Sequence, residues 1–135
     1  IPNFRGLVFF NSLSDLGATE ERLQFNGASA VSLASDINVK FRKVILEKFK
    51  NHEISLLLGT DLLARGIDIE NLEVVINFDI PRDREAYTHR SGRTGRMGNE
   101  GRVISLVSHP EDLKKLKKFA KVSEIVLKNQ EIHEK

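Results

Sequence analysis

The 135-residue sequence predicts one α/β domain built on an open parallel β-sheet with helices on both faces. Five short apolar runs recur along the chain, and several are continuously apolar, which is typical of strands covered on both sides. Segments with a helical spacing of apolar residues separate these runs, so strands and helices are expected to alternate. The five runs are residues 7–10, 30–33, 54–58, 72–78 and 103–107.

Helices are expected between the apolar runs. The clearest covers residues 39–51, where apolar side chains recur at spacings of three and four. A polar residue that can cap a helix, or a proline suited to a first turn, stands where each helix should begin. The expected starts are Ser12 or Ser14, Asp36 or Asn38, about Asp83, and Pro110. The last helix would place Leu113, Leu116 and Phe119 on one side.

Residues 1–121 are expected to form one domain, followed by a tail over residues 122–135 in which residues 124–127 are a candidate edge strand. The chain is 40% apolar and 30% charged, which is typical of a globular protein, and no apolar run approaches the roughly 20 residues of a membrane span. The lack of cysteine excludes disulfides and a Cys-based zinc site and favours a cytoplasmic location. Because the sequence starts Ile1-Pro2-Asn3, with no initiator Met or signal segment, we interpret it as part of a longer protein.

Charged and aromatic residues are distributed unevenly. The net charge of +2 is too small to indicate nucleic-acid binding by itself, but six arginines crowd residues 82–102 and five lysines crowd residues 114–121. We expect the lysines to form a solvated helix face. His52, His109 and His133 have no partner at metal-ligand spacing, so we expect surface positions and no metal site. Five phenylalanines are expected to pack in the core or on helix faces: Phe4, Phe25, Phe41, Phe49 and Phe119.

Polar residues follow the expected strands at their carboxyl ends, where parallel sheets bind ligands. These residues are Asn11 and Ser12, then Thr60 and Asp61, then Asp79. Shortly after the third run, Gly66 and Asp68 stand two residues apart. A glycine lets the backbone approach a ligand closely, and a carboxylate suits a pair of sugar hydroxyls. A nucleotide is therefore a candidate ligand for this edge of the sheet.

The strongest motif is the run His-Arg-Ser-Gly-Arg-Thr-Gly-Arg over residues 89–96. Arg93 and Arg96 lie three apart, so on a helical turn they share a face. Their planar guanidinium groups match phosphate oxygens, and two of them converging on a polyphosphate would form a transition-state clamp. No Gly-Lys-Ser/Thr follows the nearby glycines, so the chain has no nucleotide-anchoring P-loop. Taken alone, the run is also compatible with a solvated basic turn.

Taken together and in order, these motifs resemble the C-terminal RecA-like domain of the DEAD-box ATP-dependent RNA helicases. The matching stretches are residues 8–12, 59–68, 77–81 and 89–96, and the resemblance covers roughly residues 6–111. Where the family usually has His-Gly and a Gln ahead of its RNA-contacting arginine, this chain has Ala34-Ser35 and Val39. Gly59 stands where Ala or Cys is more usual.

The resemblance implies a role for each matching residue. Arg93 and Arg96 would reach the γ-phosphate, with Arg96 as the arginine finger. Asp68 would bind the ATP ribose, helped by the backbone at Gly66. Residues expected to grip the RNA backbone are Thr60, Arg42, Asn11 and Ser12, and those expected in the network joining two domains are His89 and Arg90.

The activity that the resemblance implies is ATP hydrolysis coupled to RNA duplex unwinding. ATP with Mg²⁺ would be anchored mainly by an N-terminal RecA-like domain of the same protein, which carries the P-loop, so this chain alone is predicted to be inactive. The expected partners are that domain and RNA, and no membrane. Two alternatives remain at this stage: a non-enzymatic RNA-binding module, which Gly66 and Asp68 disfavour, and a DNA translocase or helicase of the same superfamily.

Overall fold

The computed structural model describes residues 4–33, 38–61, 72–94 and 101–122. Within these ranges a five-stranded sheet has the order β2-β3-β1-β4-β5, and all neighbouring strands are parallel. The strands are β1 (Gly6–Phe9), β2 (Ala30–Ser32), β3 (Leu56–Gly59), β4 (Val74–Asn77) and β5 (Arg102–Ser105). The helices are α1 (Leu16–Phe25), α2 (Val39–Lys50), α4 (Arg84–Ser91) and α5 (Pro110–Val122). The predicted α/β class with a parallel sheet is confirmed, and each apolar run contains or overlaps one strand.

The helix starts agree with the sequence in three places out of four. Asn38 caps α2, because its side chain accepts a hydrogen bond from the Lys40 amide at 2.8 Å. Asp83 caps α4, and Pro110 opens α5. The prediction that Ser12 or Ser14 caps α1 is wrong. These two hydroxyls bond to each other at 2.8 Å, and α1 begins later, after Asp15.

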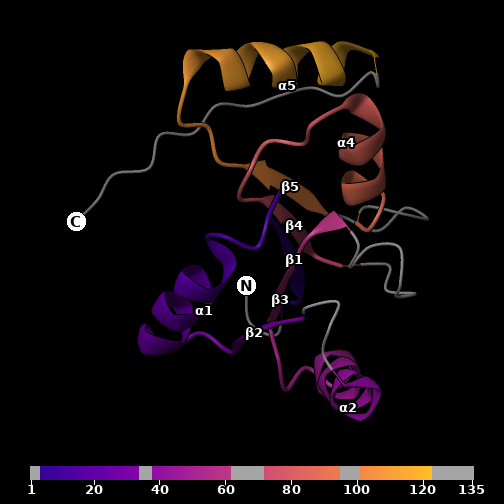
Figure 1. Ribbon diagram of the computed structural model, residues 1–135. Helices are drawn as coiled ribbons and strands as arrows, with labels where there is room; N and C mark the ends of the chain where they lie inside the picture. The colour runs from indigo at the N-terminus through magenta and orange to yellow at the C-terminus, as the bar shows by residue number, and fades with distance from the viewer. Residues whose placement is uncertain (1–3, 34–37, 62–71, 95–100, 123–135) are drawn as a thin grey trace.

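Two apolar layers lie on opposite faces of the sheet, with α1 and α2 on opposite sides (Figure 1). Successive residues of β1 point to opposite faces, as a pleated strand requires. Leu7 and Phe9 therefore pack on the face that holds Phe49 of α2, and Val8 packs on the face that holds Leu16 of α1. A third apolar cluster joins α4 to α5 and consists of Ile80, Tyr87, Leu116 and Phe119.

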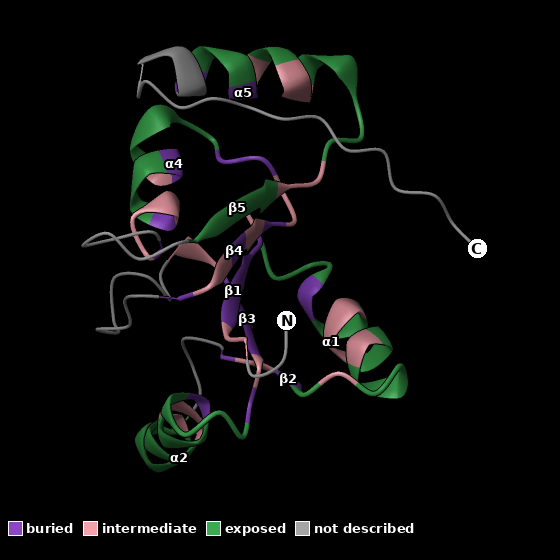
Figure 2. Cartoon of the chain, turned by 180° about the vertical axis from the view of Figure 1, so that it is seen from behind, coloured by how far each residue is buried: buried purple, intermediate pink, exposed green. Residues whose placement is uncertain are grey.

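Exposure separates the interior strands from the sheet edge at β5 (Figure 2). All four residues of β1 and of β3 are buried, whereas three of the four residues of β5 are exposed. Two predictions of aromatic packing are also wrong: Phe25 is 91% exposed and Phe41 is 65% exposed. Phe25 is the last residue of α1. Phe41 lies in the first turn of α2, two turns before the buried Phe49, so the exposed and the buried ring belong to opposite ends of one helix.

Several smaller predictions are confirmed. Phe49 and Phe119 are buried, and Phe4 packs against the core cluster on the α1 face. His52 and His109 are exposed. The solvated lysine face is confirmed for Lys114, Lys117 and Lys118, whereas Lys115 is half-buried beside the Phe119 ring and the side chain of Lys121 is not described. His133 and the candidate strand at residues 124–127 lie outside the described residues. In the part of the chain that the structure describes, every helix is too short or too polar to cross a membrane.

Candidate functional site

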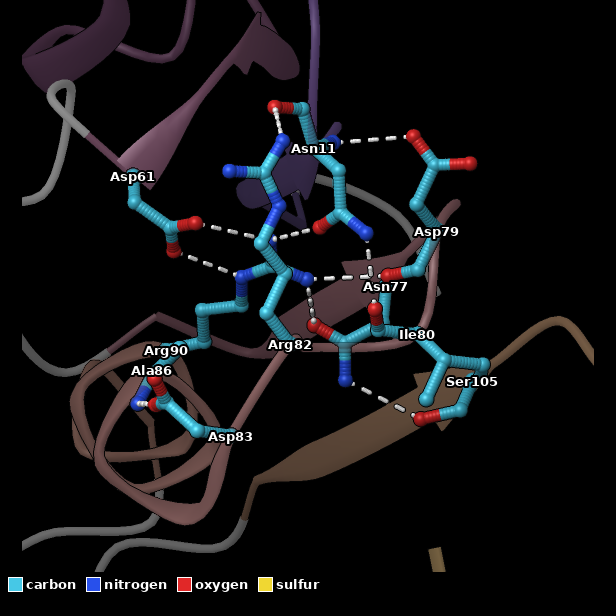
Figure 3. Close-up of polar contacts among 10 residues, drawn as sticks. All are labelled: Asn11, Asp61, Asn77, Asp79, Ile80, Arg82, Asp83, Ala86, Arg90 and Ser105. Carbon is cyan, nitrogen blue, oxygen red and sulfur yellow. Dashed lines mark hydrogen bonds and ion pairs between the residues drawn. The ribbon is translucent and has the colours of Figure 1, made fainter. Parts of the chain in front are cut away.

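The carboxyl ends of β1, β3 and β4 meet at one edge of the sheet, because neighbouring strands run parallel. Asn11 lies just beyond β1, Asp61 just beyond β3 and Asp79 just beyond β4. Helix α4 passes this edge and inserts Arg90 between them (Figure 3). The side chain of Arg90 is fully buried. We call these residues, together with Asn77 of β4, the Arg90 cluster.

Arg90 makes five hydrogen bonds within the cluster. The Arg90 Nε and Nη2 donate hydrogen bonds to the two carboxylate oxygens of Asp61, at 2.8 and 2.9 Å. Nη1 donates to the side-chain oxygen of Asn77 at 3.3 Å and to the backbone carbonyl of Asp79 at 2.9 Å. Nη2 also donates to the side-chain oxygen of Asn11 at 2.7 Å. A guanidinium group has five N–H donors, so every donor of Arg90 has a partner inside the domain.

This saturation explains how a permanent charge is accommodated in the interior. An isolated buried cation is strongly unfavourable, and pairing becomes favourable only when the remaining polar atoms are also hydrogen bonded. Asp61 supplies the opposite charge in a bidentate pair, and its side chain is 38% exposed. The Arg90 guanidinium also lies 5.2 Å from the centre of the Phe9 ring, within the range of a cation–π contact.

The two asparagines link the Arg90 cluster to the rest of the sheet edge. The side chain of Asn11 donates to the carbonyl of Ile80 at 2.9 Å, and its backbone amide donates to the Asp79 carboxylate at 2.8 Å. The side chain of Asn77 donates to the Ser105 hydroxyl at 3.0 Å and so reaches β5. The loops that begin after β1, β3 and β4 are therefore fixed relative to one another and to the last turn of α4.

The ten residues singled out in the sequence fall into three groups. The first group lies in or beside the cluster: Asn11 and Arg90 belong to it, and Thr60 precedes Asp61. Arg93 follows α4, and its backbone amide donates a hydrogen bond to the Arg90 carbonyl at 3.3 Å. Ser12 and His89 are exposed near the same edge, whereas Arg42 lies on α2 without a described contact to the cluster. Gly66, Asp68 and Arg96 lie outside the described residues.

Two expectations need adjustment on this geometry. Both polar atoms of the Asn11 side chain are already engaged within the domain, so an RNA contact through that side chain would require a bond to break. Arg90 has no donor left over for a second domain. From the sequence, Asp61 and Asp79 were expected only as polar residues at this edge, and their bonds to Arg90 and Asn11 were not predicted. Asn77 had no individual role, although it is an amide inside an otherwise apolar run.

The accessible groups at this edge determine its chemistry. Thr60 is half-buried, Ser12 is exposed, and the exposed Arg82 donates to the backbone carbonyl of Asn11 at 3.0 Å. Hydroxyls and guanidinium groups are donors that suit phosphate oxygens. Within residues 4–33, 38–61, 72–94 and 101–122, no group of three or more His, Cys, Asp or Glu side chains could hold a metal ion. The described donor set therefore fits a phosphate-bearing ligand.

The chain is similar to a known family of proteins. Residues 2–98 match the family described as the helicase conserved C-terminal domain. The chain is 45% identical over 121 residues to YfmL of Bacillus subtilis, covering 90% of this chain and 32% of that protein. It is 40% identical over 128 residues to the DEAD-box ATP-dependent RNA helicase CshC of Bacillus cereus, covering 95% of this chain and 33% of that protein. The chain thus spans about a third of the length of the curated relatives it matches.

Solved structures agree with these sequence matches. The DEAD-box protein SrmB of E. coli, solved bound to the regulator of ribonuclease activity A, superposes with a TM-score of 0.85 at 32% identity. That match covers 98% of this chain and 78% of the other. The C-terminal domain of the DEAD-box protein Dbp5 superposes with a TM-score of 0.81 at 28% identity, covering 89% of this chain and 70% of the other.

Proposed function

Because the chain belongs to the helicase conserved C-terminal domain family, as the C-terminal RecA-like domain of a DEAD-box RNA helicase, we propose that it works as one half of an ATP-dependent RNA-unwinding enzyme. The observation that carries this proposal is the sheet edge. The polar ends of β1, β3 and β4 are held together there, and the arginine run begins in the last turn of α4. This is the edge at which open parallel sheets bind ligands.

In this proposal the nucleotide is shared between two domains. ATP with Mg²⁺ supplies the γ-phosphoryl group whose transfer to water drives the cycle, and it is anchored mainly by an N-terminal RecA-like domain. This chain contributes Arg93 and Arg96, whose guanidinium forks stabilise charge on the phosphate, with Arg96 as the arginine finger. Asp68 and the backbone at Gly66 hold the ribose. His89 lies on the exposed side of α4, where it can meet the other domain.

RNA is gripped through its sugar-phosphate backbone. Thr60 and Ser12 offer hydroxyl donors at the sheet edge, with Asn11 beside them, and Arg42 offers a charge on α2. Contacts to the backbone give affinity without sequence preference. A domain that closes over ATP while gripping one RNA strand bends that strand, and the duplex then loses base pairs. We place this activity in the cytoplasm, and we expect the chain alone, which has no P-loop, to be inactive.

The nucleotide role is tested by replacing Arg96 in the full-length helicase. An arginine finger acts on charge that develops in the transition state, so its loss should appear mainly in turnover. Arg96→Ala should lower kcat about 10³-fold, with a much smaller effect on ATP affinity. Arg96→Lys keeps the charge but loses the planar fork and should rescue only in part. Arg93→Ala should behave alike, and the double variant should lose less than the sum because both residues serve one phosphate.

Single-turnover hydrolysis with saturating RNA is the appropriate measurement. Arg102→Ala is the matched control, because Arg102 is an exposed arginine of β5 outside the proposed site. If Arg96→Ala hydrolysed ATP at the parent rate and lost only RNA affinity, Arg96 would be an RNA contact and not the arginine finger. A full-length protein without any ATPase activity would instead favour the non-enzymatic RNA-binding module. RNA and DNA compared as activators of the ATPase separate an RNA helicase from a DNA translocase.

The RNA role is tested by Thr60→Ala and Arg42→Ala in the same protein. Each should weaken binding similarly for unrelated single-stranded RNA sequences, and loss of the Arg42 charge should also reduce the salt dependence. Thr88→Ala and Lys43→Ala are the matched controls, because Thr88 is an exposed threonine of α4 and Lys43 is an exposed basic residue beside Arg42 on α2. A loss confined to one RNA sequence would contradict a backbone contact.

A further inference from the structure

Phe41 is an exposed aromatic residue between basic neighbours. It stands in the first turn of α2, and 65% of its surface is exposed. Lys40 before it is exposed, and Arg42 after it is half-buried. The first turn of α2 contains no acidic residue. Contact of an aromatic ring with water is unfavourable, so a ligand that covers the Phe41 ring would gain free energy.

The first turn of α2 lies at the same edge of the sheet as Thr60. Helix α2 connects the carboxyl end of β2 to the amino end of β3, and these two strands are parallel neighbours. The helix therefore begins at the carboxyl edge of the sheet. Just after β2, the Leu33 amide donates a hydrogen bond to the Leu58 carbonyl at 2.9 Å, and Thr60 follows Leu58 by two residues. Phe41 and Thr60 thus belong to the edge where we place RNA.

The exposed apolar residues of α2 do not form one continuous apolar face. Successive residues of a helix are about 100° apart, so Val39 and Phe41 lie on nearly opposite sides of the helix axis. Val44, one turn after Phe41, is the exposed apolar residue of α2 that shares its side. A protein partner that docks through apolar contacts needs a wider patch. A planar nucleic-acid base needs the face of a single ring.

The charge of α2 also favours RNA over a second copy of the chain. Basic residues outnumber acidic residues five to one on this helix, and a symmetric dimer would bring the same positive charge against it. Around the helix axis Lys40 and Arg42 lie on either side of Phe41, where each can meet a phosphate next to a base stacked on the ring. Lys43 lies on the far side of the helix from Phe41, so it remains a suitable control for Arg42.

We propose that Phe41 is a stacking platform for one unpaired RNA base, beside the backbone contacts at Thr60 and Arg42. This inference rests on the proposed function and adds to it a contact with a base. Stacking tolerates every base, because each base has a planar face, so the site has no strict sequence preference. It does require a base that is not paired within a duplex. The platform therefore favours a strand that has separated from its partner.

The test compares RNA with and without bases as ligands of the full-length helicase. The probes are a short oligoadenylate and a ribose-phosphate oligomer of the same length that lacks bases, each with a non-hydrolysable ATP analogue present. Phe41→Ala should raise the Kd for oligoadenylate about tenfold, as expected for one lost base stack, and should leave the Kd for the base-free oligomer within about twofold. Thr60→Ala removes a backbone contact and should weaken binding of both probes by the same factor.

Two further variants separate stacking from a simple apolar contact. Phe41→Tyr keeps the ring, so its Kd for oligoadenylate should stay within about threefold of the parent value. Phe41→Leu keeps an apolar side chain but has no ring, so it should lose nearly as much affinity as Phe41→Ala. Binding of oligoadenylate by Phe41→Leu at the parent affinity would overturn the stacking role.

Phe25→Ala is the matched control, because Phe25 is 91% exposed at the end of α1, on the opposite side of the sheet from α2 (Figure 1). It should bind both probes as the parent does. The inference fails if Phe25→Ala and Phe41→Ala weaken oligoadenylate binding alike, or if Phe41→Ala binds oligoadenylate at the parent affinity. It also fails if Phe41→Ala weakens both probes equally. A parent protein that binds neither probe would instead overturn the proposed function itself.

Discussion

Strand β1 has an arginine near each of its ends, and the two are held in different ways. At the amino end the Arg5 guanidinium lies 5.7 Å from the centre of the Phe49 ring, and its Nε has no hydrogen-bond partner among the described residues. At the carboxyl end Arg90 lies 5.2 Å from the Phe9 ring and has a partner for every N–H. The ring contacts are alike, so the difference lies in the polar partners.

The two edges of the sheet differ in the kind of hydrogen bond that holds them. At the amino edge the bonds are mainly between backbones, and among the described residues the Glu73 carboxylate accepts a hydrogen bond only from the Arg5 backbone amide, at 2.9 Å. At the carboxyl edge, side chains from three strand ends converge on one cation. Backbone bonds tolerate many side chains, whereas a converging network depends on each member. The amino edge therefore serves the fold, and the carboxyl edge serves the proposed site.

The largest loss of unfolding free energy is expected from Arg90→Ala, at the carboxyl end of β1. Arg90→Ala leaves Asp61 without its counter-charge and leaves Asn11, Asn77 and a carbonyl without a donor. Removing one partner of a buried ion pair costs about 3 to 5 kcal/mol, and the lower end applies because the Asp61 side chain is partly exposed. Urea unfolding of the chain, followed by circular dichroism, measures this loss. A loss below about 1 kcal/mol would mean that water replaces Arg90 without penalty.

A smaller loss is expected from Gly6→Ala at the amino end. A Cβ at this position would lie 2.5 Å from Cγ1 of Val74 and 3.0 Å from the Val74 carbonyl oxygen, so β1 and β4 would have to separate. Overpacking of this kind costs about 1 to 3 kcal/mol. The same unfolding experiment tests it, with Gly17→Ala as the control, because nothing lies within 4 Å of a Cβ there. Equal stability of the two variants would contradict the close packing at Gly6.

Glu73→Gln should have a slight effect. The amide oxygen of glutamine can still accept from the Arg5 amide, and only the charge is lost, so we expect a change within about 0.5 kcal/mol. The isosteric change Asp61→Asn at the other end should cost several times more, because it removes the charge that balances Arg90. If the two variants lost similar amounts of unfolding free energy, side-chain bonds would matter no more at the carboxyl edge than at the amino edge.

The smallest expected quantity is the coupling between the two ends. Glu73→Gln combined with Arg90→Lys should give the sum of the single effects within about 0.5 kcal/mol, because the two positions share no partner. A double-mutant cycle on unfolding free energies measures this term. A coupling well above that value would show that the two edges respond as one unit.

The sequence was sufficient for the fold because its signals are local. The unbroken apolar runs of β1 and β3 predict strands covered on both faces, and Asn38 and Pro110 mark helix starts. Exposure was harder to predict. Phe41 and Phe49 share one stripe of α2, so helical spacing alone does not tell that Phe49 is buried and Phe41 is exposed. The apolar run at residues 103–107 predicts a buried strand, but β5 comprises Arg102–Ser105 at the end of the sheet order, and three of its four residues are exposed.

The candidate site was predicted in part. The arginine run, Thr60 and Asp68 stand out as motifs because their neighbours in sequence identify them. The members of the Arg90 cluster also lie in the matching stretches, but nothing in the sequence shows that they bond to one another: Asn11 and Arg90 are 79 residues apart, and Asp61 and Arg90 are 29 apart. A saturated guanidinium can be recognised only when its partners are placed around it. The family resemblance implied a contact between domains for Arg90, whereas its described partners all lie within this domain.

The position of β1 also has a consequence for synthesis of the chain. Gly6 pairs with Leu56 of β3 and with Val74 of β4, so the first strand of the described sheet is also its central one, and its neighbours follow 50 (56 − 6) and 68 (74 − 6) residues later. Contacts between such distant segments slow folding, because a long loop must close first. While the ribosome makes the next fifty residues, the apolar β1 has no sheet partner. We expect β1 to be exposed to aggregation during that interval, and a translational pause once Asn77 has left the ribosome would give the three central strands time to assemble.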